Sequence, residues 1–375
     1  MRISIARGPA LVAVSAALVA LSACSPPASN NAAGTDAAKA TSAADLGGMD
    51  KLIEAAKAEG ELNVIALPPD WANYGEIIKA FNTKYGIKVN SAQPDASSQD
   101  EINAAKQLKG QNGAPDVFDV GTAVALANTS IFAPYKVATW NDIPDALKEA
   151  SGKWVNDYGG YMSIGYDAAK VPAPTSLADL LGAAYKGKVA LNGDPTQAGA
   201  AFNGVVMASL GSGGSADDIS KGVDFFNQLK KAGNFLPVDP TPATIESGQT
   251  PVVFDWDYLN VAQGVKLKGK VDWKTVVPSN AVVGSYYIQA INVDAPHPAA
   301  ARLWQEFLYS DEGQNLWLKG GARPVRADAM TTAGTLDTAA FSALPAAVGT
   351  PVFLTEVQTK SANDYLAANW AKAIG

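Results

Sequence analysis

The stretch Asp157–Asp167, DYGGYMSIGYD, decides how this chain is organised. It is interpreted as an extended segment, and a second such segment follows at Gly284–Val293, GSYYIQAINV. Strands and helices alternate on both sides of these two segments, yet no Pro/Gly/Ser-rich linker separates them. Two α/β sets without a linker predict interleaved lobes. We expect the chain to leave one lobe at the first segment and to return at the second.

The alternation itself is read from apolar spacing, with glycines at helix ends. Ser98 and Glu101 have the spacing of a capping box at the start of one predicted helix. Strands that alternate with helices predict a parallel sheet covered on both faces. Helices are predicted at 49–60, 74–86, 98–110, 122–131, 176–184, 196–210, 216–233, 258–269 and 298–321, and strands at 62–67, 87–92, 116–121, 188–193, 251–256, 273–278 and 286–293.

Composition limits the function. The 375 residues are 47% hydrophobic and 17% charged, which is typical of a globular protein. The formal charge is −7 and basic clusters are absent from the sequence, which disfavours nucleic acid as a partner and favours cationic ligands. Dinucleotide or phosphate-binding loops and clusters with zinc-ligand spacing are also absent, so no cofactor and no metal are predicted.

The first residues resemble a secretory signal, because Arg2 and Arg7 precede an apolar run that ends in small residues. Leu21-Ser22-Ala23-Cys24 resembles the lipobox of bacterial lipoproteins, which implies cleavage after residue 23 and a lipid on Cys24. The alternative is an ordinary signal peptide with an incidental cysteine. Residues 24–48 are rich in small and polar residues and are predicted to be a flexible tether. The protein would then work outside the cytoplasmic membrane, held there by its lipid.

Several motifs in order resemble bacterial ABC-importer solute-binding proteins, in the branch that binds polyamines, ferric iron, thiamine or aminoethylphosphonate. The resemblance spans roughly 62–326. The motifs are FNTKYGIKV (81–89), GAPDVFDVG (113–121), YMSIGYD (161–167), LNGDPTQAGAAF (191–202), QAINVDAPHPAAARLWQEFLYSDEGQ (289–314) and GGARPV (320–325).

This resemblance implies a type II periplasmic-binding-protein fold: two interleaved α/β lobes joined by a hinge, closing on one small-molecule ligand. Lobe one is expected at 49–162 plus 288–375, and lobe two at 163–287. The implied partners are a membrane permease and its ATPase, and the protein is expected to be a monomer without enzymatic activity.

Ligands in open α/β sheets lie outside the carboxyl ends of the strands, which selects five loops. Trp71 and Tyr74 could cover a ligand or pack on a helix, and Thr122 could cap its helix while facing the ligand. The loop GDPTQ, with Asp194, Thr196 and Gln197, opens a helix and could hold an anion or simply cap the helix.

The loop at 254–260, FDWDYLN, carries the most chemistry. If the strand persists, Asp255 and Asp257 lie on one side and Trp256 on the other; if it ends at Phe254, all three can enter the cleft, followed by Tyr258. The resemblance places Trp256 at a tryptophan that contacts the ligand in polyamine binders. A ring with a carboxylate suits an alkylammonium group. The alternative is a capping aspartate beside a core tryptophan.

A small organic cation such as a polyamine is the first expectation for the ligand, and other classes stay open. Tyr286 and Tyr287 stand where polyamine binders carry a tryptophan and an aspartate, which weakens that assignment. Ferric iron would use the tyrosines and carboxylates, and a phosphonate or other anion would use GDPTQ and Arg323. A hydrolase that uses Asp255 and Asp257 is a further alternative. The only histidine, His297, is expected to be a solvated turn residue.

Overall fold

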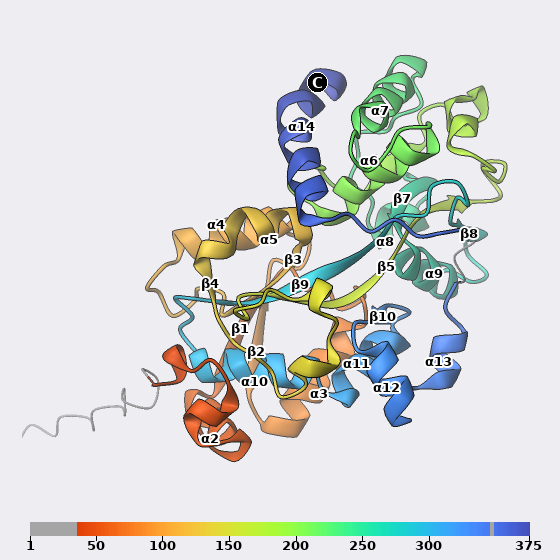
Figure 1. The fold of residues 1–375 in the computed structure, drawn as a ribbon. Helices are drawn as coiled ribbons and strands as arrows, with labels where there is room; N and C mark the ends of the chain where they lie inside the picture. The colour runs from red at the N-terminus through yellow and green to blue at the C-terminus, as the bar shows by residue number, and fades with distance from the viewer. Residues whose placement is uncertain (1–35, 346–348) are drawn as a thin grey trace, which may run out of the picture.

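The computed structural model describes residues 36–345 and 349–375, so the predicted signal, Cys24 and the start of the tether lie outside the described residues. The fold is mixed α/β, as predicted (Figure 1). The alternation in the first third of the chain is confirmed. Its elements are η1 (Ala43–Leu46), α2 (Met49–Glu59), β1 (Glu61–Ile65), α3 (Tyr74–Tyr85), β2 (Lys88–Ala92), α4 (Ser98–Gln107), β3 (Val117–Gly121), α5 (Thr122–Asn128), η2 (Thr129–Ile131), β4 (Phe132–Ala133), η3 (Trp140–Asp142) and η4 (Asp145–Leu147).

The middle of the chain departs from prediction at 176–184, where two short 3₁₀ turns replace the expected helix. The Asp179 carboxylate accepts hydrogen bonds from the backbone of Thr175 and Ser176, and Gly182 then interrupts the turn, so no longer helix propagates. The elements here are β5 (Val155–Asp167), η5 (Leu177–Leu181), η6 (Ala183–Tyr185), β6 (Val189–Leu191), α6 (Gly199–Gly211), α7 (Ser220–Ala232), α8 (Pro242–Glu246), β7 (Val252–Trp256), α9 (Asp257–Lys266) and β8 (Trp273–Val276).

The long helix predicted at 298–321 is also two helices. Ser310 has extended backbone angles, and its hydroxyl accepts a hydrogen bond from Gly313 N at 3.2 Å, so it ends one helix and caps the next. The last elements are β9 (Gly284–Asn292), α10 (Pro298–Leu308), α11 (Asp311–Lys319), β10 (Arg323–Pro324), α12 (Ala327–Ala333), α13 (Thr338–Ser342) and α14 (Glu356–Ile374).

Both predicted extended segments are strands, β5 and β9, and they pair antiparallel with each other. The first half of β5 pairs with β9 and β10, and its second half pairs with β7 and β8. The parallel sheet predicted from the alternation is wrong for the larger sheet. In its order β3-β9-β5-β7-β6 only β7 and β6 pair parallel, because the two long strands β5 and β9 run antiparallel to their neighbours. The strands β1 and β2 form a separate parallel pair. The strands β5 and β9 therefore lie between β3 on one side of the sheet and β7 and β6 on the other, as Figure 1 shows.

A third segment, near the C-terminus, runs parallel to the chain at the start of β9. Val352 bridges to Val283, and Gly284 N donates to Val352 O at 2.9 Å. This segment leads to α14, which packs against α7 and α5 (Figure 1). The division into lobe one and lobe two stays a prediction, and α14 contacts elements of both. Within residues 36–345 and 349–375, no helix is long and apolar enough to cross a membrane.

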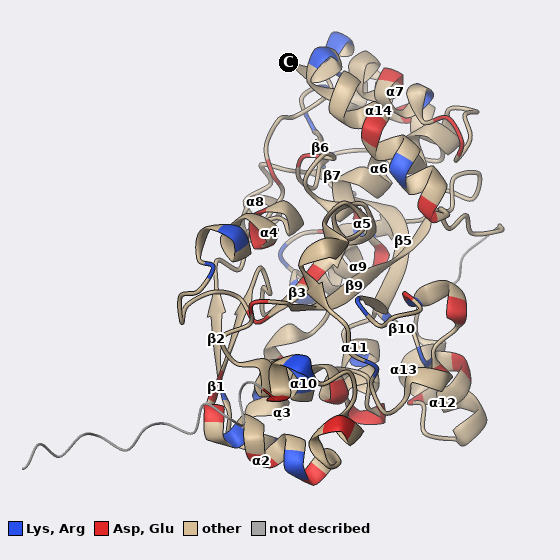
Figure 2. Cartoon of the chain, turned by 60° about the vertical axis from the view of Figure 1, so that its left-hand side comes forward, with Lys and Arg blue, Asp and Glu red and all other residues tan. Residues whose placement is uncertain are grey.

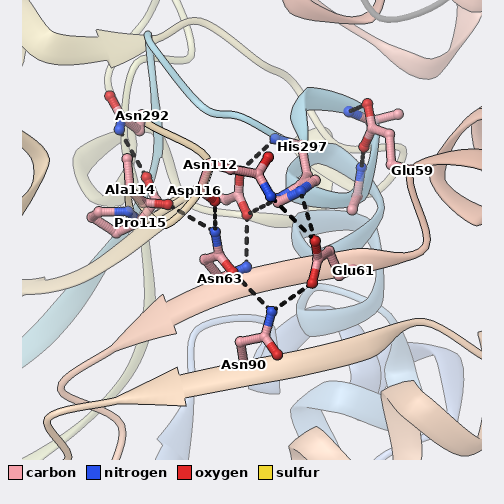
Figure 3. A network of polar contacts seen from close by, with 12 residues as sticks. Glu59, Glu61, Asn63, Asn90, Asn112, Ala114, Pro115, Asp116, Asn292 and His297 are labelled. Carbon is pink, nitrogen blue, oxygen red and sulfur yellow. Dashed lines mark hydrogen bonds and ion pairs between the residues drawn. The ribbon is translucent and has the colours of Figure 1, made fainter. Parts of the chain in front are cut away.

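His297 is not a solvated turn residue, contrary to expectation. It is 5% exposed, and its Nδ1 lies 2.9 Å from Oδ2 of the buried Asp116 (Figure 3). Asp116 also accepts from Asn63 N at 2.6 Å and from His297 N at 2.7 Å, while Glu61 Oε1 lies 3.5 Å from His297 Nε2. Although burial alone lowers the pKa of His297, its hydrogen bond to Asp116 and the neighbouring carboxylates raise it overall.

We therefore expect His297 to make folding stability depend on pH. Because its pKa is raised in the fold, the stabilisation is present below pH 6.5 and is lost as the pH rises through the raised value. Urea unfolding of wild type and His297→Gln should differ by about 1–3 kcal/mol at pH 6, and by less at pH 8.5. A difference that is the same at both pH values would contradict this role.

Candidate ligand cavity

A cavity of about 470 Å³ lies between elements of the predicted lobes. The loops after β1 and β2, the first turn of α4 and Asp119 of β3 line one side, and the loop after β6, the segment around α8 and the start of α9 line the other. This is the carboxyl-end edge of the strands that sequence reasoning selected. Two loops on the first side hold non-glycine residues at positive φ, at Ala66 (57°), Ala72 (45°), Asn73 (69°) and Gln93 (42°). Such strained backbone clusters at ligand-binding sites.

The cavity wall is strongly acidic. Among the described residues that line it are eight carboxylates and no lysine, arginine or histidine. Asp70 alone among them forms an ion pair with a described residue, Lys266 at the rim. Basic residues instead appear on peripheral elements, including the helices α2 and α14 (Figure 2). The acidic lining residues are Asp70, Asp95, Asp100, Glu101, Asp119, Asp194, Asp239 and Asp255.

Asp119, on β3, is the centre of a buried acidic cluster. Its Oδ2 accepts from the Tyr158 hydroxyl at 2.8 Å. The Tyr74 hydroxyl also lies beside this carboxylate and lowers its pKa, but no donor among the described residues is close enough to form a hydrogen bond with the buried Oδ1. Burial raises the pKa of Asp119 to about 7. Glu101 Oε2 accepts from Asp119 N at 3.0 Å, and burial together with the Asp119 charge raises the pKa of Glu101 well above its ordinary value. Asp157, behind Asp119, has its pKa raised by the same two causes.

Glu101 faces the cavity because the capping box of α4 begins one residue earlier than the sequence predicted. The capping box is formed by Ser97 and Asp100, not by Ser98 and Glu101: Asp100 N donates to Ser97 Oγ at 3.3 Å, and Ser97 N donates to Asp100 Oδ2 at 2.9 Å. Ser98 and Glu101 instead turn inward, where Ser98 Oγ accepts from Gly121 N at 3.0 Å. Two residues expected to cap the start of a helix thus hold the carboxyl end of β3 beside the cavity.

The opposite wall carries Asp255, which is 8% exposed. The strand β7 persists to Trp256, so Asp255 faces the cavity and Trp256 does not. Burial raises the pKa of Asp255 to about 7, although Asn192 and the backbone of Trp256 donate to it. Tyr287 also lines the cavity, and burial raises the pKa of its hydroxyl.

The other predicted site residues divide into two groups. Trp71, Asp194 and Gln197 line the cavity together with Asp255 and Tyr287. Trp71 Nε1 donates to the Tyr158 hydroxyl at 2.7 Å, so the ring is held directly beside the acidic cluster. The loop GDPTQ does not open a helix, contrary to prediction, because α6 begins at Gly199 with Ala198 at its N-cap and without a side-chain cap. Asp194 Oδ1 instead accepts from Thr196 N at 2.8 Å within the preceding turn.

The remaining predicted residues lie away from the cavity. Thr122 and Thr196 line a small adjoining hollow of about 10 Å³. Asp257 forms an ion pair with Arg323 at 2.8 Å, and the guanidinium also lies 4.2 Å from the centre of the Tyr161 ring. The buried or packed aromatic residues are Tyr74, which accepts from Gln289, Trp256, which stacks on Tyr258, and Tyr286, which stacks on Phe353.

Sequence reasoning missed Glu101 and Asp119 as site residues. A signal was present, because Asp119 interrupts the apolar strand DVFDVG two residues before the carboxyl end of that strand. A carboxylate inside a strand that is otherwise apolar is costly unless a partner compensates its charge. Glu101 offered no comparable signal, because acidic residues are common in the first turn of a helix.

Comparison with known proteins identifies the family. The profile of the bacterial extracellular solute-binding proteins matches residues 111–347. This chain belongs to that family. The resemblance seen in the sequence is confirmed, and the chain is a solute-binding protein rather than an enzyme. No curated protein matches the sequence.

Solved structures share the fold at low sequence identity. The periplasmic binding protein P5PA superposes with a TM-score of 0.65 at 18% identity, covering 84% of this chain and 100% of that one. Iron-bound HitA from Pseudomonas aeruginosa gives a TM-score of 0.61 at 20% identity, covering 84% and 99%. AfuA from Actinobacillus pleuropneumoniae, with fructose-6-phosphate bound, gives 0.64 at 16% identity, covering 84% and 98%.

The acidic cluster should lower the stability of the empty protein at neutral pH. Because the pKa of Asp119 is raised to about 7, the stabilisation it provides is complete below pH 3.8 and is lost as the pH rises through about 7. Asp119→Asn should therefore be more stable than wild type at pH 8, by an amount on the order of 2 kcal/mol, and less so at pH 5. Urea unfolding at both pH values measures this.

The matched control is Asp95→Asn, which changes an exposed carboxylate of the same wall and should keep the wild-type pH dependence. If Asp119→Asn unfolds like wild type at pH 8, burial of this carboxylate carries no cost.

Proposed function

We propose that this protein captures a small organic cation, of the polyamine class, in the acidic cavity and delivers it to the permease and ATPase of an ABC importer. The observation that carries the proposal is a wall of eight carboxylates without a basic residue among the described lining residues. A bound cation would supply the positive partner that the carboxylates of Asp119, Glu101 and Asp255 lack in the cavity wall.

The energetics favour a charged amine over a neutral solute. An ammonium group could donate to the unpartnered Oδ1 of Asp119 and to Asp255 on the facing wall, and charge-assisted hydrogen bonds of this kind are short and strong. The rings of Trp71 and Tyr287 border the same space and could contribute cation–π contacts. A volume of about 470 Å³ lies within the usual range for small-molecule sites.

The other ligand classes have weaker support. Of the tyrosines that ferric iron would use, only Tyr287 is among the described residues that line the cavity, while Tyr258 stacks on Trp256 and Tyr286 stacks on Phe353, which gives less support to iron. An anion would meet a wall of like charge, and Arg323, which could have bound one, is engaged by Asp257. Membership in an extracellular family supports the importer role, and the lipobox-like segment at Cys24 supports attachment to the membrane.

Titration calorimetry with spermidine tests the ligand class. Asp119→Asn should weaken binding by tenfold or more, because one charge-assisted contact is removed. Wild-type affinity should rise as the pH increases from 5.5 to 8, since the cation favours the ionised form of a carboxyl whose pKa is about 7.

Asp50→Asn, on the exposed first turn of α2, is the control and should bind as wild type does. Heat released by fructose-6-phosphate, with none from spermidine or putrescine, would contradict the cation proposal.

Truncation of Trp71 should weaken ligand binding, whereas truncation of Trp256 should weaken the fold. Trp71→Ala should reduce spermidine affinity by roughly 3- to 30-fold, because the ring borders the cavity. Trp256→Ala should lower the free energy of unfolding by about 3–5 kcal/mol, because the ring is 1% exposed in the core. Calorimetry and urea unfolding of both variants separate the two roles. A larger loss of affinity for folded Trp256→Ala than for Trp71→Ala would reverse the assignment.

A further inference from the structure

Two glycines meet where the walls of the cavity touch. Gly121 is the last residue of β3 and Gly199 is the first residue of α6, so they come from opposite sides of the cavity. Beside them, Gln99 N donates to Gln197 O at 3.3 Å. We call Gln99, Gly121, Gln197 and Gly199 the seam. Gln197 and Gly199 also line the cavity, so the seam forms part of its boundary.

Backbone conformation does not require glycine at this contact. Gly121 has φ −61° and ψ 148°, which any residue can adopt, and Gly199 lies in the first turn of a helix. Close approach does require it. A Cβ on Gly121 would lie 2.8 Å from Gly199 Cα, and a Cβ on Gly199 would lie 3.1 Å from Gly121 Cα. The nearest obstacle in both cases is backbone, which cannot rotate away as a flexible side chain can, although a Cβ on Gly199 would also lie 3.2 Å from the Tyr287 hydroxyl.

We propose that Gly121 and Gly199 set the width of the cavity in the closed protein and thereby determine its affinity for ligand. The proposal rests on the proposed function only in that closure of the walls accompanies ligand capture. A methyl group at either position would hold the walls apart along the seam. It would act on the ligand through the position of the walls, and Gly121 itself does not line the cavity.

The position of the seam makes its width important for binding. Asp119 lies two residues before Gly121 on the same strand. Gly121 N donates a hydrogen bond to Oγ of Ser98, which lies on α4 together with Glu101. A wider seam would admit water beside these carboxylates. Water weakens the attraction between a carboxylate and a bound cation by raising the local dielectric response. Affinity would then fall although every ligand contact residue is still present.

Disulfide trapping measures closure of the seam without any ligand. Gln99→Cys and Gln197→Cys place two thiols across the seam, and Cys24→Ser removes the only native thiol. With oxidised glutathione as oxidant, two thiols lose two protons and two electrons to form the bridge, and glutathione is reduced. The rate of bridge formation reports how often the seam closes. This rate is compared in full-length protein carrying Gly121→Ala, Gly199→Ala or Gly113→Ala.

Gly113→Ala is the matched control, since a Cβ there meets nothing within 4 Å and the backbone is not at positive φ. We expect Gly121→Ala to slow trapping about tenfold relative to this control. Gly199→Ala should slow it less, because its contact is longer by 0.3 Å. Trapping in both variants at the rate of Gly113→Ala would overturn the proposal. If Gly121→Ala unfolds, as thermal melting would show, the result for Gly199→Ala decides.

A second arm separates this proposal from the proposed function. Spermidine should accelerate trapping in the protein with both seam glycines intact. If it does not, the cation assignment fails, but the comparison of glycine variants without ligand still stands. Conversely, if spermidine accelerates trapping and the glycine variants match the control, ligand-linked closure is retained and the glycine proposal is wrong.

Discussion

The burial of Asp119 and Glu101 side by side, without a basic neighbour among the described residues, is the constraint on which the site depends. Burial removes both carboxylates from water and raises both pKa values, and the Asp119 charge raises the pKa of Glu101 further. Hydrogen bonds from Tyr158 and from the backbone of Asp119 offset part of this cost. A ligand could relieve the rest of this cost, because a cation in the cavity would place a positive charge beside carboxylates that have none in the empty protein.

The fold makes this arrangement possible by holding the carboxylates on rigid elements. Asp119 lies on β3, which pairs with β9, and Tyr158 lies on β5, which pairs with β9 on its other edge. Asp255 lies on β7, which pairs with the far half of β5. The same strand β5 therefore orients the tyrosine beside one carboxylate and the strand that carries the other. A shift of β5 would move both walls of the cavity.

Much of this arrangement could be predicted from the sequence. Apolar spacing and the missing linker identified β5 and β9, and the strand-end rule selected the loops that carry Asp255, Gln197 and Trp71. Register was harder to predict. A strand that persists to Trp256 rather than ending at Phe254 turns the ring into the core. A capping box at Ser97 rather than Ser98 turns Glu101 into the cavity. Local propensity leaves such one-residue choices open, and tertiary packing decides them.

The aromatic residues Trp256 and Tyr258 of the FDWDYLN segment pack behind the cavity wall rather than lining the cavity. Trp256 and Tyr258 stack at 6.2 Å behind the wall, and Trp256 Nε1 donates to the Tyr287 hydroxyl at 3.4 Å. Tyr287, Tyr158 and Trp71 then form an aromatic layer between this core and the carboxylates. Apolar rings of this size exclude water from the acidic cluster. Exclusion of water strengthens the attraction of the cluster for a cation, and it also raises the cost of leaving the cavity empty.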